Sequence, residues 1–191
     1  MEKIIFVPGI NAQNWNSNIV DLFSIRLILN KYDVRYFMYD RKADESLMNV
    51  AKDLRKYINK IKLKKGEKII LIGHSAGGLI IDYYLKFLNN KKVSQFVSIA
   101  TPFKGCLWLN YIHEDKKAIE EMAPGSSFLK KLTKKRIGNV KRLSIWCYAD
   151  YVVPGKSCMD INSRMSIFPV HMIAHLWPPT VYEIKEFLED N

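Results

Sequence analysis

The chain has few cysteines, no long apolar run and no stretch rich in proline, glycine and serine. Its three cysteines, Cys106, Cys147 and Cys158, are widely spaced and match neither a metal-ligand pattern nor a disulfide framework, so we expect free thiols in a reducing cytoplasm. No apolar run approaches the roughly 20 residues that span a bilayer. Because no linker or internal repeat divides the sequence, we expect one domain over residues 1–191.

Acidic residues are scarce relative to basic ones. The sequence holds 30 Lys and Arg against 19 Asp and Glu, a net charge of +11, with lysines clustered at 60–68, at 91–92 and between 130 and 142. No basic stretch carries the interleaved aromatics of a nucleic-acid motif, so we expect no nucleic-acid partner. Two interpretations of the basic surface stay open: peripheral contact with an anionic membrane, and a surface that is only exposed to solvent. The N-terminus shows no secretory signal pattern, which favours a cytoplasmic location.

Short apolar runs alternate with amphipathic stretches. Strands are predicted at IIFV, VRYFMY, KIILIG, SQFVSIA, RLSIWCYA and RMSIFPV. Helices are predicted over 19–29, 45–61, 76–88 and 181–188, and the irregular segment 101–138 is predicted to form a helical excursion over one edge of the site. Strands that are apolar on both faces and separated by helices predict a parallel sheet covered on both sides. Functional groups then gather beyond the carboxyl ends of the strands.

The segment 73–77, GHSAG, forms a G-x-S-x-G motif between a predicted strand and a predicted helix, which is the context of a nucleophile elbow. Small residues at both ends let the two backbones approach closely, and the helix N-terminus faces the reacting centre. We therefore assign Ser75 as the nucleophile. The side chain of His74 is expected to point away from the site in a structural role. The alternative is a helix-capping serine beside glycines.

A serine hydroxyl needs a base, and the base needs an orienting acid. In chains with this motif the acid and then the histidine follow the serine. Asp150 follows the strand RLSIWCYA and precedes a turn that would fix its direction, so we assign it as the acid. Asp40 lies upstream of the serine, and no apolar strand leads into Asp160, which is the weaker candidate.

Four histidines are available for the role of base. His113 is expected in solvent, whereas His171 and His175 lie in the loop before the last predicted helix. We assign His175, because the base must reach Ser75 from a loop beyond the sheet, and keep His171 as the alternative. Their four-residue spacing also suggests zinc, but the zincin motif requires glutamate where this chain has Met172. No metal or organic cofactor is therefore expected.

Two backbone amides are expected to form an oxyanion hole. Ala76 directly follows the nucleophile and supplies one of them. The loop after the first strand, PGIN at 8–11, is positioned to supply the other, which we assign to Ile10.

With these residues in place, the chain resembles compact bacterial lipases and lipase-like esterases of the α/β-hydrolase superfamily. FVPGINAQNW resembles their oxyanion loop, LIGHSAGGLIIDYYL their nucleophile elbow, VSQFVSIATPFKG their T-P-H-x-G segment, and CYADYVVPG their acid loop. HMIAHLWPPTVYEIKEFL resembles their G-x-x-H-L-x-x-x-P ending, which implies His175 as the base. Pro8 and Phe103 stand where the family usually has histidine. The resemblance implies a minimal α/β-hydrolase fold of about six mostly parallel strands with helices on both faces.

We therefore predict a serine carboxylic-ester hydrolase that cleaves a small-molecule acyl ester through an acyl-enzyme. The apolar residues predicted to line its substrate pocket are Phe103, Trp108, Val152, Leu176 and Trp177. The same triad would serve a thioesterase or an amidase. A catalytically silent binding protein of the same fold is the alternative of a different class. The sequence leaves the oligomeric state open.

Overall fold

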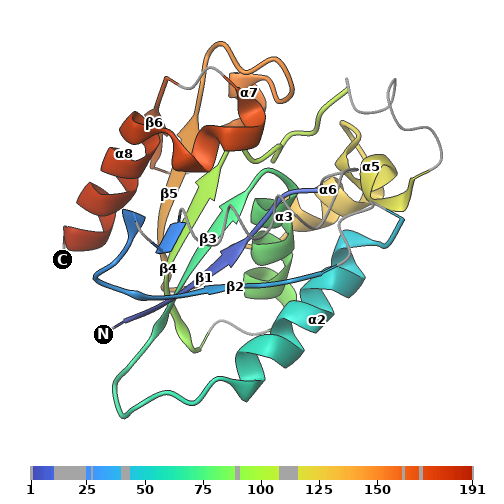
Figure 1. Ribbon diagram of the computed structural model, residues 1–191. Helices are drawn as coiled ribbons and strands as arrows, with labels where there is room; N and C mark the ends of the chain where they lie inside the picture. The colour runs from blue at the N-terminus through green and yellow to red at the C-terminus, as the bar shows by residue number, and fades with distance from the viewer. Residues whose placement is uncertain are drawn as a thin grey trace.

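The computed structural model describes residues 2–10, 25–26, 28–39, 44–88, 91–107, 116–160, 162–167 and 170–190. At its centre lies a six-stranded sheet in the order β2-β1-β3-β4-β5-β6, in which every neighbouring pair is parallel (Figure 1). The strands are β1 (Lys3–Val7), β2 (Asp33–Tyr36), β3 (Ile69–His74), β4 (Val93–Ile99), β5 (Lys141–Trp146) and β6 (Ser163–Met165). The predicted parallel sheet of an α/β fold is confirmed.

Helices cover both faces of the sheet. On one side lie α2 (Leu47–Lys60), α3 (Ala76–Tyr83) and the π-helical turn η1 (Tyr84–Leu88), followed along the chain by α5 (Lys117–Met122) and α6 (Ser127–Thr133). On the other side lies α8 (Pro178–Glu189), whose buried residues share a core cluster with residues 25 and 29 (Figure 1). The short helices α7 (Gly155–Cys158) and η2 (His171–Leu176), a 3₁₀-helix, follow β5 and β6.

The middle strands are apolar on both faces because both faces are packed. All six residues of β3 are buried; Ile69 and Leu71 face the α2 and α3 cluster, and Ile70 and Ile72 face the α8 cluster. Side chains alternate between the faces of a strand, so a strand buried on both sides reads as a continuous apolar run. This explains why the central strands were predictable from the sequence.

The outer elements differ more from their predictions. The predicted strand VRYFMY is shortened to β2, which begins one residue earlier and ends at Tyr36. Of RMSIFPV, the described residues keep only Arg164 and Met165 in β6, which pairs with β5 alone within the described sheet and is mostly exposed. Helix α8 begins three residues before the predicted start, with proline in its first turn. The predicted helix 19–29 is described only in part, and the predicted excursion contains α5 and α6.

The glycines around the elbow let α3 pack directly on strand backbone. A Cβ atom at Gly73 would lie 2.7 Å from the Cα of Gly78, and one at Gly77 would overlap the carbonyl oxygen of Val7. Neither neighbour is a flexible side chain that can move aside. The small ends of the G-x-S-x-G motif are therefore required by the close contact of α3 with β1 and β3.

We expect Gly77→Ala to lower the free energy of unfolding by about 3 kcal/mol, because the added methyl group forces α3 away from β1. Urea denaturation followed by circular dichroism measures this loss. Gly66→Asn is the matched control, since no atom lies within 4 Å of its added Cβ and asparagine tolerates the φ of +81° found there. Equal stability of the two variants would contradict the packing argument.

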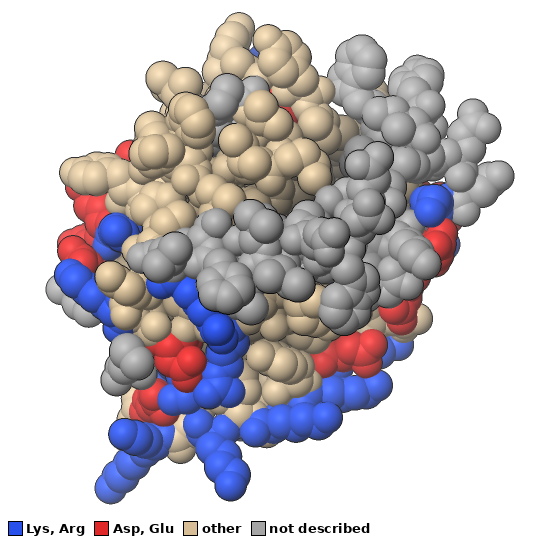
Figure 2. All heavy atoms as spheres, in the orientation of Figure 1, with Lys and Arg blue, Asp and Glu red and all other residues tan. Residues whose placement is uncertain are grey.

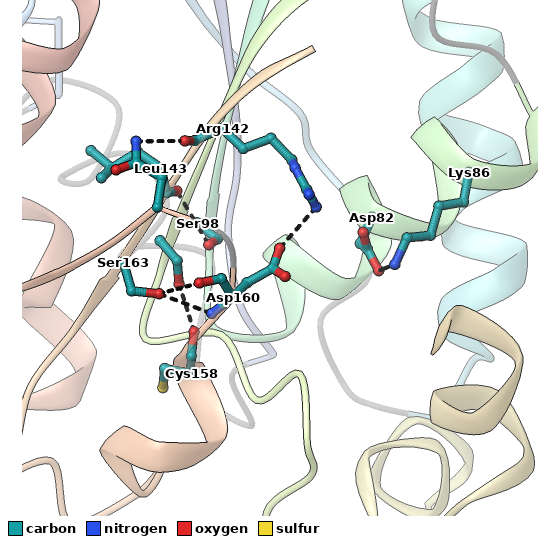
Figure 3. Close-up of polar contacts among 10 residues, drawn as sticks. Asp82, Lys86, Ser98, Arg142, Leu143, Cys158, Asp160 and Ser163 are labelled. Atoms are coloured by element: carbon teal, nitrogen blue, oxygen red, sulfur yellow. Dashed lines mark hydrogen bonds and ion pairs between the residues drawn. The ribbon is translucent and has the colours of Figure 1, made fainter. Parts of the chain in front are cut away.

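Helix α3 also carries a buried carboxylate, Asp82, whose Oδ2 lies 2.8 Å from the Nζ of Lys86 in an ion pair (Figure 3). Its side chain is 1% exposed, and its Oδ1 has no hydrogen-bond partner among the described residues. Burial raises the pKa of Asp82 to about 6, and the nearby negative charge of Asp160 acts in the same direction. The folded state therefore binds a proton at this site more tightly than the unfolded chain.

A pKa raised by folding stabilises the protein fully below the unfolded value near 3.8, and this contribution is lost as the pH rises through about 6. Asp82→Asn is therefore expected to remove about 3 kcal/mol of pH dependence in the free energy of unfolding between pH ~4 and ~7. Urea denaturation across this range measures the difference. Asp53→Asn, which removes an exposed ion pair with Lys56, is the control that should leave the slope unchanged.

Candidate active site

Ser75 occupies the sharp turn between β3 and α3. Its backbone has φ 53° and ψ −125°, a conformation that L-residues rarely adopt and that costs about 1–3 kcal/mol. The turn is held in place by the Ser75 amide, which donates a 2.8 Å hydrogen bond to the carbonyl of Ile99 in β4. The nucleophile elbow predicted from the motif has the strained geometry that brings the hydroxyl to the carboxyl edge of the sheet.

A histidine meets this hydroxyl, and it is His171. Its Nε2 lies 3.0 Å from Ser75 Oγ, and its Nδ1 lies 2.8 Å from Asp150 Oδ2. A carboxylate only accepts hydrogen bonds, so Nδ1–H donates to Asp150 and Nε2 is left to accept the Ser75 hydroxyl proton. The side chains of His171 and Asp150 are 5% and 0% exposed.

Asp150 is oriented by its own loop. Its Oδ1 accepts hydrogen bonds from the amides of Val152 at 2.9 Å and Val153 at 3.0 Å, which leaves Oδ2 for His171. The turn after Asp150 thus fixes the carboxylate as the sequence predicts. The weaker candidate, Asp160, instead pairs with Arg142 at 2.9 Å (Figure 3).

The assignment of His175 as the residue that reaches Ser75 is wrong. Its ring packs against Phe6 at 5.1 Å between centroids and lines a small apolar cavity beside α8. Both histidines belong to the 3₁₀-helix η2, which has about three residues per turn, so a four-residue step rotates the side chain by about 120°. His171 therefore faces the elbow while His175 faces the core.

The loop after β1 passes beside Ser75. A Cβ atom at Gly9 would lie 2.8 Å from the Cβ of Ser75, so Gly9 contacts the elbow directly. Ile10 is the next residue along the chain. Ala76 is the first residue of α3 and is buried. The hydroxyl of Tyr39 donates a 2.8 Å hydrogen bond to the carbonyl of Pro8, a support for this loop that the sequence did not reveal.

The predicted pocket residues make contacts of several kinds. Phe103 packs at the edge of the core under α2 and α3, and Val152 borders the buried cluster of Cys106, Val153 and Cys158. Leu176 and Trp177 pack against the α8 core, so their described contacts are those of core residues. Trp108, like His113 and Asp40, lies outside the described residues.

The three cysteines of the chain are buried, and burial, with a smaller effect of Asp150, raises the pKa of the Cys158 thiol far above its ordinary value. A protonated, enclosed thiol is unreactive. Within the described part of the chain, no group of three or more His, Cys, Asp and Glu side chains is arranged to hold a metal ion. None of the described helices is long and apolar enough to cross a membrane.

Solved structures share this fold over nearly the whole chain. The Legionella pneumophila phospholipase PlaB, in complex with thio-NAD, has a TM-score of 0.77 at 14% identity over 99% of this chain and 59% of its own. A Bacillus licheniformis lipase in its mature form has a TM-score of 0.69 and 15% identity, and the match covers 98% of this chain and 90% of the lipase. A metagenomic carboxyl esterase has a TM-score of 0.72 and 13% identity, and the match covers 100% of this chain and 76% of the esterase. Identities this low show a common α/β-hydrolase fold.

Sequence comparisons place the chain within a family. A Mycoplasma pneumoniae protein whose name assigns it as an esterase/lipase is 32% identical over 80 residues, which are 42% of this chain and only 29% of that relative's length. The sequence profile of the lecithin:cholesterol acyltransferase family matches residues 13–136, a segment that covers more than half of the chain and contains Ser75. The protein is therefore a lipase-like α/β-hydrolase that belongs to the lecithin:cholesterol acyltransferase family.

Proposed function

We propose that the protein is a serine carboxylic-ester hydrolase in which Ser75, His171 and Asp150 form the catalytic triad. The observation that carries this proposal is the hydrogen-bonded line from Asp150 Oδ2 through His171 to Ser75 Oγ, with distances of 2.8 and 3.0 Å. Its three members lie in segments that follow β3, β5 and β6, whose carboxyl ends lie at one edge of the sheet. Such an arrangement activates a hydroxyl for acyl transfer.

The geometry supports a two-step reaction. As Ser75 Oγ attacks the ester carbonyl, His171 Nε2 takes its proton and Asp150 stabilises the resulting imidazolium. The amides of Ile10 and Ala76 are proposed to hold the oxyanion, at the head of α3 where negative charge is favoured. His171 then returns the proton to the departing alcohol, leaving an acyl-enzyme. Water, deprotonated by the same imidazole, hydrolyses it.

Exposed apolar side chains around the carboxyl edge of the sheet support an apolar acyl substrate. Leu107 is 61% exposed after β4, Tyr151 is 85% exposed after β5, and Ile167 is 71% exposed after β6. This end of the molecule is also poor in charged side chains, as the upper part of Figure 2 shows. Exposed apolar residues after three strands, at the edge of the sheet that carries Ser75, favour acyl chains over charged acids.

The lysine clusters lie at the opposite end. Residues 60–68 precede β3 and residues 91–92 precede β4, which places them at the amino edge of the sheet. Figure 2 shows the Lys and Arg side chains gathered in the lower half of the molecule. Contact with an anionic membrane through these lysines would turn Ser75 away from the lipid. The proposed reaction therefore does not depend on such contact.

We expect Ser75→Ala and His171→Ala to lower kcat/KM on a p-nitrophenyl ester by about 10⁴-fold or more, because each removes a member of the triad. Both should also abolish rapid labelling by a fluorophosphonate probe. His175→Ala is the matched control, since it removes an imidazole from the same 3₁₀-helix, and should retain activity within about tenfold. An inactive His175→Ala beside an active His171→Ala would reverse the assignment. Absence of Ser75-dependent labelling would favour the silent binding protein.

The apolar edge predicts a preference among esters. From acetate to octanoate, kcat/KM should rise by up to about fourfold for each added methylene, the limit set by burying one CH₂ group. Matched thioesters and amides of the best acyl chain, assayed with Ser75→Ala as background, separate an esterase from a thioesterase or amidase. Faster turnover of the thioester or amide would replace the ester in this proposal. A flat or falling series would contradict an apolar acyl site.

A further inference from the structure

We propose that His74 is a positioning residue that fixes the backbone of the base, His171. The inference rests on the proposed function, because it gives His74 a part in aligning the same triad. His74 is the last residue of β3 and directly precedes Ser75. Ile70 and Ile72 of the same strand face the α8 cluster, and alternation along the strand places the His74 side chain on that face too.

One contact between His74 and His171 is a hydrogen bond. The Nε2 atom of His74 lies 2.9 Å from the backbone carbonyl oxygen of His171. A carbonyl oxygen only accepts, so His74 carries a proton on Nε2 and donates it to this bond. The two residues are 4% and 7% exposed, so water does not compete for the interaction. Because His171 is the first residue of η2, the bond anchors the start of the turn that carries the base.

The His74 ring also packs against the ring that it positions. Its centroid lies 5.0 Å from that of His171. The base is thus connected through His74 to the middle of the sheet. The two ring nitrogens of His171 are engaged by Asp150 and Ser75, and the contacts from His74 restrain the main chain of the turn that carries this ring.

This arrangement joins two halves of the site through neighbouring residues. Ser75 presents the hydroxyl, and the residue before it holds the main chain of the histidine that must accept the proton. A displacement of about 1 Å between reacting groups can lower a rate about 100-fold. A histidine that served only to fill the core would change stability and the folded fraction, whereas a positioning residue changes kcat per folded molecule. Because His74 acts through His171 and not on the substrate, KM should change little.

The test compares two substitutions of His74 on a p-nitrophenyl ester. His74→Leu keeps the apolar bulk and removes the donor, and we expect kcat to fall about 10- to 100-fold with KM within about threefold of wild type. His74→Gln keeps an N–H donor at similar reach and should recover about tenfold of that loss. The rate of Ser75 labelling by a fluorophosphonate should fall and recover in parallel, because it depends on the same proton transfer.

His175→Leu is the matched control, since it removes the neighbouring buried imidazole and should keep kcat within about threefold. Circular dichroism and the unfolding midpoint establish that each variant is folded. The positioning role alone would be overturned by a folded His74→Leu variant with wild-type kcat, provided that Ser75→Ala and His171→Ala are inactive. Equal losses in His74→Leu and His74→Gln would overturn it as well. Full activity of Ser75→Ala and His171→Ala would instead overturn the proposed function.

If His74→Leu does not fold, His74→Asn takes its place, because its amide is one carbon shorter than that of glutamine and does not reach the His171 carbonyl. A kcat for His74→Asn about tenfold below that of His74→Gln supports the proposal. Equal values for the two amides overturn it.

Discussion

The hydrogen bond between the Ser75 hydroxyl and the His171 imidazole is the contact on which the rest of the site depends. It forms only because Ser75 holds a backbone conformation with φ 53°, which aims its side chain out of the sheet edge and toward η2. Such strain persists only where the surroundings fix it. Here the restraint is the fully buried strand β3 before it and the close-packed helix α3 after it.

That restraint consists largely of backbone packed against backbone. Gly9, Gly73 and Gly77 lie where β1, β3 and α3 approach too closely for a Cβ atom. Contact at this distance leaves α3 little freedom to tilt, so the helix N-terminus and Ala76 keep their place beside Ser75. The loop that carries Ile10 is fixed by the same contact. Packing needed for the fold and geometry needed for the proposed acyl transfer are therefore one constraint.

Ser75 and Asp150 could be found from sequence because local signals mark them: a G-x-S-x-G turn after a buried strand, and a carboxylate after another strand with a turn behind it. The base carried no such signal. Two histidines four residues apart would share a face on an α-helix, but the 3₁₀ geometry of η2 separates them, and only His171 meets Ser75. The support from Tyr39 to Pro8 and the contact from His74 to His171 join distant segments, and no local pattern encodes them.

Each member of the proposed triad is held in place by a different kind of contact. The elbow fixes Ser75 by backbone packing, the amides of its own loop fix Asp150, and a strand residue holds the main chain of His171. The histidine needs this outside support most, because the strand before it, β6, has three residues and, in the described part of the sheet, one neighbour. In a short chain with a weak edge strand, the well-packed centre of the sheet is the nearest rigid support. The hydrogen bond from His74, at the end of β3, connects the main chain of His171 to that centre.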